Sequence, residues 1–229
     1  MRGRGEGETM TRGLATAMWA AILLLIAIVL AFAGMRVADD LPLIVSGVPA
    51  ERGSFGERYV ANPWLAYPHI VPGVLYLIGA PLQLSRRFRS RHFAFHRRFG
   101  RVLIVLGIVS GVFALVFGVH FAFGGAWQSL AAAVFGSWFL VALLLAFRAI
   151  RRRDVRMHRR WMIRAFAVGL GVGTIRIWVG LFALLDLTSL RESFAPAFWL
   201  GLSMHVLAAE AWLWWRPNAN GRPRRSVLP

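Results

Sequence analysis

Residues 86–118 read RRFRSRHFAFHRRFGRVLIVLGIVSGVFALVFG, and residues 148–180, which begin 62 positions later, read RAIRRRDVRMHRRWMIRAFAVGLGVGTIRIWVG. The two stretches align without a gap and share five arginines, one histidine and three glycines. Arginine is common in this chain, so the glycines and the shared histidine (His96 and His158) fix the alignment. An internal repeat constrains architecture directly. This one predicts a helical hairpin used twice, with a His-Arg-Arg corner in each copy.

Six apolar stretches read as membrane-spanning helices, which need about 20 residues to cross the hydrocarbon core. The chain has 229 residues, of which 58% are hydrophobic, and it leaves no stretch that could form a separate soluble core. We therefore predict an all-α, polytopic transmembrane bundle in which spans two to five form the two repeated hairpins. The predicted spans are Leu14–Met35, Pro68–Leu84, Val102–Phe123, Trp127–Phe147, Trp161–Leu185 and Ala197–Trp215.

The chain organisation follows from these spans. We predict a tail over residues 1–13, a first anchor over 14–35, a loop over 36–64, a repeat-containing core over 65–215 and an arginine-rich tail over 216–229. The chain has no cysteine, which excludes disulfides, thiolate metal sites and cysteine nucleophiles.

Charge is distributed unevenly between the loops. All 27 basic residues are arginine, and the net charge is +17. Residues 86–101 carry seven arginines and residues 148–164 carry eight, whereas the loops over 36–64 and 186–196 hold four arginines against six acids. This alternation is the positive-inside pattern of a membrane protein. It predicts a polytopic membrane protein with both termini cytoplasmic, in contact with anionic lipids and not with nucleic acid.

The two corners are the first candidate site. His96 and Arg97 in one copy correspond to His158 and Arg159 in the other. Such a set can be a pair of interfacial histidines among arginines that contact lipid headgroups, a paired anion site in which arginine supplies planar donor forks, or a haem site with histidine as axial ligand. The nearby His92 lies among arginines that repel divalent cations, so no metal site is predicted.

Charges inside the predicted spans form the second candidate site. Arg176 and Glu210 are costly in hydrocarbon unless they are paired or hydrated, so each is a functional candidate. At about 1.5 Å per residue their depths differ by more than about 10 Å. Arg164 matches the depth of Glu210 and is its expected partner. Arg176 is expected to face a polar pocket in the outer half, near His69.

Several motifs resemble a known family. They are HIVPG from His69, PLQ from Pro81, HRxxGR from His96, HRxWMIR from His158, Arg176, and Ala-Glu at 209–210. Over about residues 55–215 they resemble the bacterial membrane family called domain of unknown function 2306. The resemblance implies a multi-pass inner-membrane protein without an established activity, cofactor or substrate. It also adds Gln83 to the candidate residues of the intramembrane site.

Together these observations predict a non-enzymatic membrane protein that binds a small ligand or anionic lipid at two polar centres. The alternatives are a b-type cytochrome, with haem b held by histidines among His69, His96 and His158, and a small transporter. The cytoplasmic centre comprises His96, Arg97, His158 and Arg159, and the intramembrane centre comprises His69, Gln83, Arg176 and Glu210.

Overall fold

The computed structural model describes residues 2–215, with the side chains of residues 13–85 and 87–215, and this part of the chain contains helices and no strand. Six helices are long and apolar enough to span a membrane, which confirms the predicted all-α, six-span fold. The helices are α1 (Arg2–Ser46), α2 (Glu57–Ala61), α3 (Pro63–Leu84), α4 (Arg86–Arg91), α5 (Phe93–His120), α6 (Ala126–Arg151), α7 (Val155–Leu184) and α8 (Leu190–Trp215).

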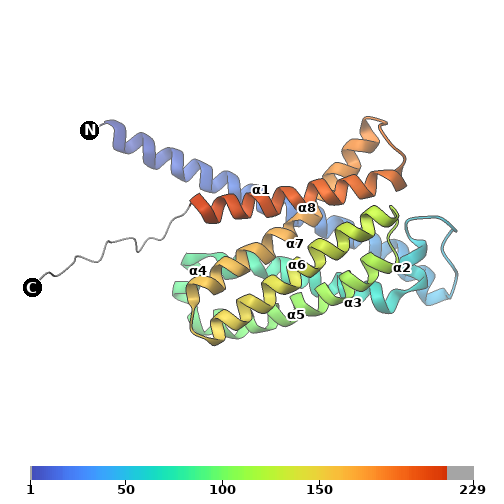
Figure 1. Ribbon diagram of the computed structural model, residues 1–229, viewed down its shortest axis with the longest axis horizontal. Helices are drawn as coiled ribbons and strands as arrows, with labels where there is room; N and C mark the ends of the chain where they lie inside the picture. The colour runs from blue at the N-terminus through green and yellow to red at the C-terminus, as the bar shows by residue number, and fades with distance from the viewer. Residues whose placement is uncertain (1, 216–229) are drawn as a thin grey trace, which may run out of the picture.

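The four helices of the predicted repeat form the centre of the bundle. Helix α3 packs against α5, α5 against α6, and α6 against α7, which contacts α3 and closes the ring. Helix α1 lies against α7 and α3, and α8 lies against α7 and α6 (Figure 1). Helix α4 and the turn between α6 and α7 lie at one end, which we call the arginine end. Helix α2 and the segment 47–56 lie at the opposite end, which we call the loop end.

Helix α1 is longer than the predicted anchor over residues 14–35. It begins at Arg2 and ends at Ser46, so most of the predicted tail 1–13 and the first part of the predicted loop 36–64 are helical. Ion pairs from Arg36 to Asp39 (3.5 Å) and Asp40 (2.6 Å), one turn along, favour this extension. The predicted tail 216–229 lies outside the described residues.

The two corners have different local structures. In the first, the Ser85 hydroxyl accepts a hydrogen bond from the Phe88 amide and caps the separate helix α4. In the second, α6 continues to Arg151, and a short turn follows with Arg153 at φ 61°. Asp154 then caps α7. Residues that the sequence alignment equates thus adopt different structures at the corners, and the internal repeat stays a prediction.

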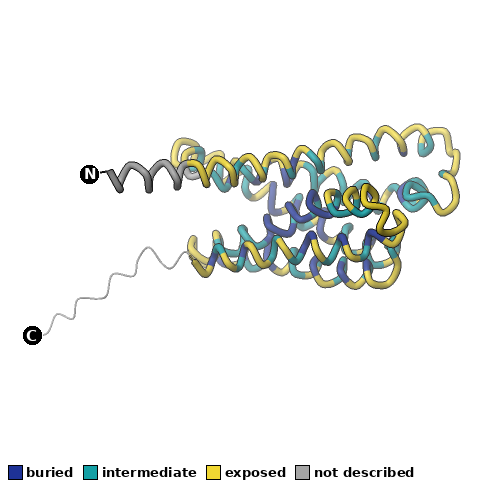
Figure 2. The backbone as a smooth tube through the Cα atoms, turned by 90° about the horizontal axis from the view of Figure 1, so that it is seen from above, coloured by how far each residue is buried: buried dark blue, intermediate teal, exposed yellow. Residues whose placement is uncertain are grey.

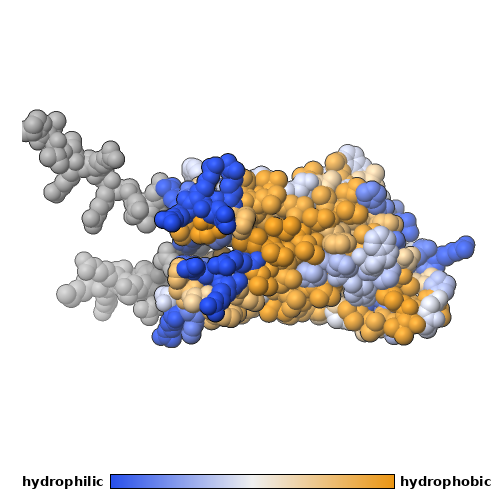
Figure 3. All heavy atoms as spheres, turned by 90° about the horizontal axis from the view of Figure 1, so that it is seen from below, coloured by the Kyte–Doolittle hydropathy of each residue, from blue (hydrophilic) through white to orange (hydrophobic). Residues whose placement is uncertain are grey.

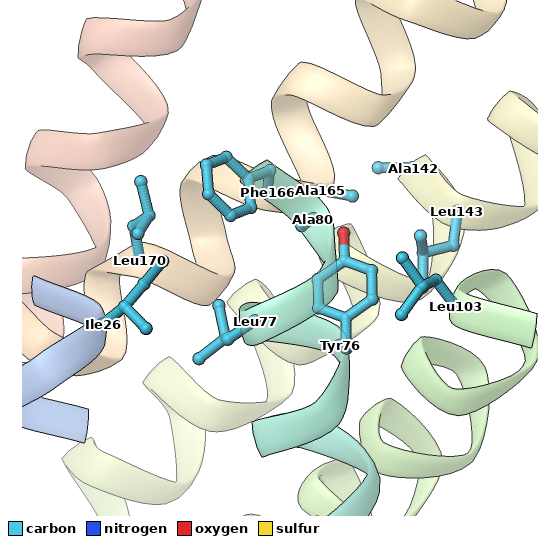
Figure 4. Packing of buried hydrophobic residues seen from close by; sticks show 10 residues of the cluster. All are labelled: Ile26, Tyr76, Leu77, Ala80, Leu103, Ala142, Leu143, Ala165, Phe166 and Leu170. Atoms are coloured by element: carbon cyan, nitrogen blue, oxygen red, sulfur yellow. The ribbon is translucent and has the colours of Figure 1, made fainter. Parts of the chain in front are cut away.

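The main core cluster lies where the central helices meet (Figure 4). Tyr76 of α3 stands between Gly107 of α5 and Gly169 of α7. A Cβ atom added at Gly107 would lie 3.1 Å from Cδ2 of this ring, and one at Gly169 would lie 3.7 Å from its Cε1. Small residues let helices approach closely in lipid. These two glycines, which are equivalent in the predicted repeat, thus share Tyr76 as a packing partner.

The outer surface of the bundle is apolar. Buried residues face the centre in Figure 2, and the outward sides carry exposed aliphatic residues such as Leu23, Val105 and Leu144. Figure 3 shows a broad hydrophobic surface, with a strongly hydrophilic region at one end and a mixed surface at the other. Water-soluble proteins rarely expose so much contiguous apolar surface. A lipid-facing belt accounts for it.

Candidate functional site

A cavity of about 520 Å³ lies inside the loop-end half of the bundle. All six long helices line it, together with α2 and the residue Phe55 that precedes it. Tyr76, Gly107 and Gly169 form its floor near the middle of the bundle, and most of its lining is apolar. The volume is within the roughly 300–1,000 Å³ that is typical of small-molecule sites. The polar lining residues are Arg36, Asp39, Arg58, Tyr59, His69, Ser110, Gln128 and Arg176.

Three arginines of this lining converge on the ring of Phe55. The ζ-carbon of Arg58 lies 4.5 Å from the ring centroid, that of Arg36 lies 5.7 Å from it, and that of Arg176 lies 5.9 Å from it. They come from α2, α1 and α7. Aromatic neighbours from α2, the α5–α6 turn and α8 surround Phe55. Aromatic faces attract guanidinium groups, which lets three like charges gather at the cavity.

The charges of these arginines are compensated unequally. Arg36 forms an ion pair with the fully buried Asp40. Arg58 donates from Nη1 to the carbonyl oxygen of Phe121 at 2.8 Å, and its buried Nε has no partner. Arg176 lies 5.4 Å from the ring centroid of Phe32. Within the described part of the chain, Arg176 has neither a hydrogen bond nor an ion pair, and no carboxylate pairs with Arg58.

Electrostatics at Arg58 reflect this arrangement. Burial lowers the pKa of Arg58 from its ordinary value, Tyr59 opposes that change, and the positive charges of Arg176 and Arg36 lower the pKa further. The guanidinium nevertheless stays charged at neutral pH. Burial and the neighbouring positive charges therefore destabilise the charged form of Arg58, and a bound anion would stabilise it.

His69 and Ser110 join α3 to α5 along one wall. The Nδ1 atom of His69 lies 3.1 Å from the hydroxyl oxygen of Ser110 and 3.2 Å from its carbonyl oxygen. The Ser110 hydroxyl donates to the carbonyl oxygen of His69 at 2.8 Å. A Cβ atom at Gly73 would lie 2.7 Å from the same hydroxyl, so this approach needs a glycine. His69 lines the same cavity as Arg176, so the structure brings these two predicted site residues together.

A family model described as a predicted membrane protein (DUF2306) matches residues 66–215. The chain belongs to this family. The match contains His69 and Arg176, whereas Arg36 and Arg58 precede it. No curated protein and no solved structure matches the chain.

The four residues predicted as an intramembrane centre do not form one site in this DUF2306 protein. Arg164 donates to both carboxylate oxygens of Glu210, at 2.6 and 2.8 Å, which confirms the predicted ion pair. Gln83 is buried in the last turn of α3. It is 14 residues from His69 and therefore about 21 Å along the helix. Only His69 and Arg176 share the cavity, because the other two residues lie towards the arginine end.

The corner histidines both lie at the arginine end. His96 lies near the start of α5 and His158 near the start of α7, both beside the arginine corners. The Nδ1 atom of His158 donates to a backbone carbonyl oxygen of α6 at 2.9 Å, whereas the buried Nδ1 of His96 has no partner. Arg97 and Arg159 are exposed. The structure therefore places the two histidines at the same end of the bundle and leaves both arginines on the surface.

The three histidines considered as haem ligands lie at opposite ends of the DUF2306 bundle. His69 is at the loop end, and it is the only histidine that lines the cavity. His96 and His158 are at the arginine end. The described residues contain no group of three or more His, Cys, Asp or Glu that could hold a metal ion.

Sequence reasoning missed the residues that surround the cavity opening. Arg36, Phe55 and Arg58 belong to the segment predicted as a loop, and nothing in hydropathy predicts that this segment folds back over the bundle. A signal was present, because Arg36 and Arg58 are exceptions to the arginine depletion of that side.

Proposed function

We propose that this membrane protein binds a small amphipathic anion in the loop-end cavity, without catalysing a reaction. The anionic head contacts Arg58 and Arg176, and the apolar body extends along the cavity towards Tyr76. The supporting observation is Arg176, whose guanidinium lies within a membrane-spanning helix and lacks a polar partner in the described part of the chain.

The energetics favour a missing counter-ion. A charge within the membrane costs a few kcal/mol unless it is paired or hydrated. The faces of Phe32 and Phe55 near Arg176 offset part of this cost, since a cation–π contact contributes about 0.5–2 kcal/mol. An anion next to the guanidinium would offset the rest of the cost of this charge.

The cavity lining also favours one chemical class of ligand. Guanidinium groups bind carboxylate and phosphate through two parallel hydrogen bonds. Asp39 and Asp40 both pair with Arg36, and among the described residues no carboxylate pairs with Arg58 or Arg176, so the positive charges of these two arginines are uncompensated. The remaining lining is mostly apolar. A long-chain carboxylate or a lipid phosphate satisfies both conditions, and a neutral or cationic amphiphile does not.

The arginine distribution supports an orientation for this site. Arginine-rich segments remain on the cytoplasmic side of bacterial membranes. We therefore place the protein in a bacterial inner membrane with both termini cytoplasmic, which puts the cavity in the half of the bilayer that faces the periplasm.

The proposal is tested with purified protein in nanodiscs and three fluorescent probes: a long-chain fatty acid, a phosphatidic acid and a long-chain alcohol. The two anions should bind more tightly than the alcohol, and their relative affinities distinguish a carboxylate from a lipid phosphate. Arg176→Gln should weaken anion binding by about tenfold or more, because a hydrogen bond to a charged group contributes roughly 1.5–3 kcal/mol.

Arg191→Gln is the matched control. Arg191 is an exposed arginine at the same end, 4.8 Å from the centroid of the Phe123 ring, and it does not line the cavity. This variant should bind the anions like the wild type. Equal affinity for the alcohol, or unchanged anion binding in Arg176→Gln, would contradict the proposal.

The cytochrome and transporter alternatives are less well supported. Bis-histidine haem ligation needs two axial ligands, and the cavity offers only His69. A reducible Soret band in the purified protein would favour the cytochrome, and uptake of the bound anion into proteoliposomes would favour the transporter.

A second candidate function is anion binding at the arginine end. The position of both His-Arg corners at one end of the bundle supports it, because one phosphate or lipid headgroup could contact both corners. Arg97 and Arg159 would supply planar donor forks to that anion.

A further inference from the structure

A row of buried polar atoms leads from the cavity floor towards the arginine end. The hydroxyl of Tyr76, both amide atoms of Gln83 and Nδ1 of His96 are buried and have no hydrogen-bond partner among the described residues. All three side chains come from α3 and α5. This row lies beyond the ligand cavity proposed above and is not explained by anion binding there.

These residues follow one another along α3 and α5, from the cavity floor towards the arginine end. Tyr76 and Gln83 are seven residues apart, so they share one face of α3 and lie about 10.5 Å apart along it. The Oε1 atom of Gln83 faces α5, 3.2 Å from the place of a Cβ atom at Gly100. His96 lies one turn before Gly100 on α5. His158 lies at the same end, near the start of α7.

Tyr76 forms the end of the row that meets the cavity. Its ring lines the cavity floor between Gly107 and Gly169. In Figure 4 its hydroxyl points towards Ala80 and Ala165 in the core cluster. These alanine side chains fill little volume, and none of them offers the hydroxyl a hydrogen bond.

Such groups are costly in this environment. A buried polar atom without a hydrogen bond is strongly unfavourable inside a membrane, where an apolar residue of similar size would carry no such cost. Buried water commonly binds groups of this kind. A hydroxyl and an imidazole that are joined by water can each accept a proton on one side and release one on the other, and the amide of Gln83 can orient the bridging water through its acceptor oxygen and donor NH2 group.

We infer that this row conducts protons between the loop-end cavity and the histidine pair at the arginine end. A proton from water in the cavity reaches the Tyr76 hydroxyl at the cavity floor and passes along bridging water beside Gln83. Nδ1 of His96 accepts it, and it leaves to solvent at the arginine end. No other bond forms or breaks, and movement of a separate ion such as potassium balances the charge.

Proteoliposomes that contain a pH-sensitive dye and potassium test the inference. Valinomycin sets a potassium diffusion potential, and proton entry changes the dye fluorescence. Proton entry should be faster into vesicles that contain the wild-type protein than into protein-free vesicles. Tyr76→Phe and Gln83→Leu should each lower the protein-dependent rate by about tenfold or more, equivalent to an added barrier of about 1.4 kcal/mol. Gln83→Glu keeps a polar group of the same shape and should retain the flux.

Two control variants test whether proton flux depends on this row in particular. Trp138→Phe also removes a buried N–H without a partner, but this residue packs on Trp161 (centroids 6.0 Å apart) and on the second core cluster, outside the row. It should conduct like the wild type. Arg176→Gln should lose anion binding and keep proton flux, so failure of the proposed ligand site remains distinguishable.

Three results would overturn the inference. They are a wild-type flux equal to that of protein-free vesicles, wild-type rates in both Tyr76→Phe and Gln83→Leu, and an equal loss in Trp138→Phe. The first does not depend on the folding of any variant.

Discussion

The Arg164–Glu210 ion pair joins α7 to α8 within the membrane-spanning region. Both carboxylate oxygens accept hydrogen bonds from one guanidinium, which also lies 4.5 Å from the centroid of the Trp161 ring. Removal of either partner leaves a charge whose cost in hydrocarbon is no longer offset. The pair therefore stabilises the contact between these two helices only when both charges are present.

This dependence gives a prediction for a double-mutant cycle. The free energies of unfolding of Arg164→Ala, Glu210→Ala and the double variant, measured in mixed micelles, should show a coupling of about 0.5–3 kcal/mol. Arg176→Ala combined with Glu210→Ala is the control, and it should be additive within about 0.5 kcal/mol, because the two residues are at different depths. Additivity of the first pair would contradict the observed ion pair.

The corner arginines give a second prediction at the scale of single residues. Arg97→Lys and Arg159→Lys keep the charge and lose the planar fork. If both corners hold one anion, each change should lower phosphate affinity by about tenfold, the equivalent of 1.4 kcal/mol, with folding unchanged. His96→Ala and His158→Ala should lower phosphate affinity by a similar factor. Titration calorimetry measures all four affinities. Normal binding in all four variants would reduce the corners to signals for membrane topology.

Glycines set how closely the helices approach one another. Gly173 and Gly180 both lie on α7 and both recur in the predicted repeat, yet their surroundings differ. A Cβ atom at Gly173 would lie 2.8 Å from the backbone oxygen of Leu25 in α1, whereas one at Gly180 would meet nothing within 4 Å. Two glycines that recur in the same sequence pattern are thus packed differently, because α1 lies against Gly173 and not against Gly180.

The same substitution at both positions measures that difference. Gly173→Ala should lower the free energy of unfolding by about 1–3 kcal/mol, because α1 must move away. Gly180→Ala should be neutral or should stabilise by up to about 1 kcal/mol through helix propensity. Thermal unfolding of the two variants in one detergent checks both values. Similar stabilities would contradict the close contact between α1 and α7.

Element positions were predictable here and the contacts between distant elements were not. Hydropathy located all six spans, and depth along a helix paired Arg164 with Glu210. Neither property describes how residues 47–61 fold back over the bundle, so Phe55 and Arg58 were missed. Gln83 was grouped with His69 although about 21 Å of helix separates them.

For the whole molecule, the structure fixes which segments share an end, and charge supports which end faces the cytoplasm. Both arginine corners, the start of α1 and the end of α8 lie together (Figure 1). Each arginine near an anionic membrane surface contributes about 1 kcal/mol. Residues 86–101 and 148–164 carry 15 arginines, seven plus eight, and the two loops at the opposite end carry four. Translocation of the arginine end would therefore be far more costly than translocation of the loop end.

This difference predicts one orientation for every loop. Reporter fusions at Ser90, Arg153 and Asn218 should report the cytoplasm, and fusions at Gly53 and Ser189 should report the periplasm. Because the helices share one bundle, the five sites are not independent, and a single inverted corner would be incompatible with the packing of α3, α5, α6 and α7. Inversion of all five would preserve the fold and open the cavity to the cytoplasm. The anion would then come from the cytoplasmic leaflet, and protons would enter the Tyr76 row from the cytoplasmic side.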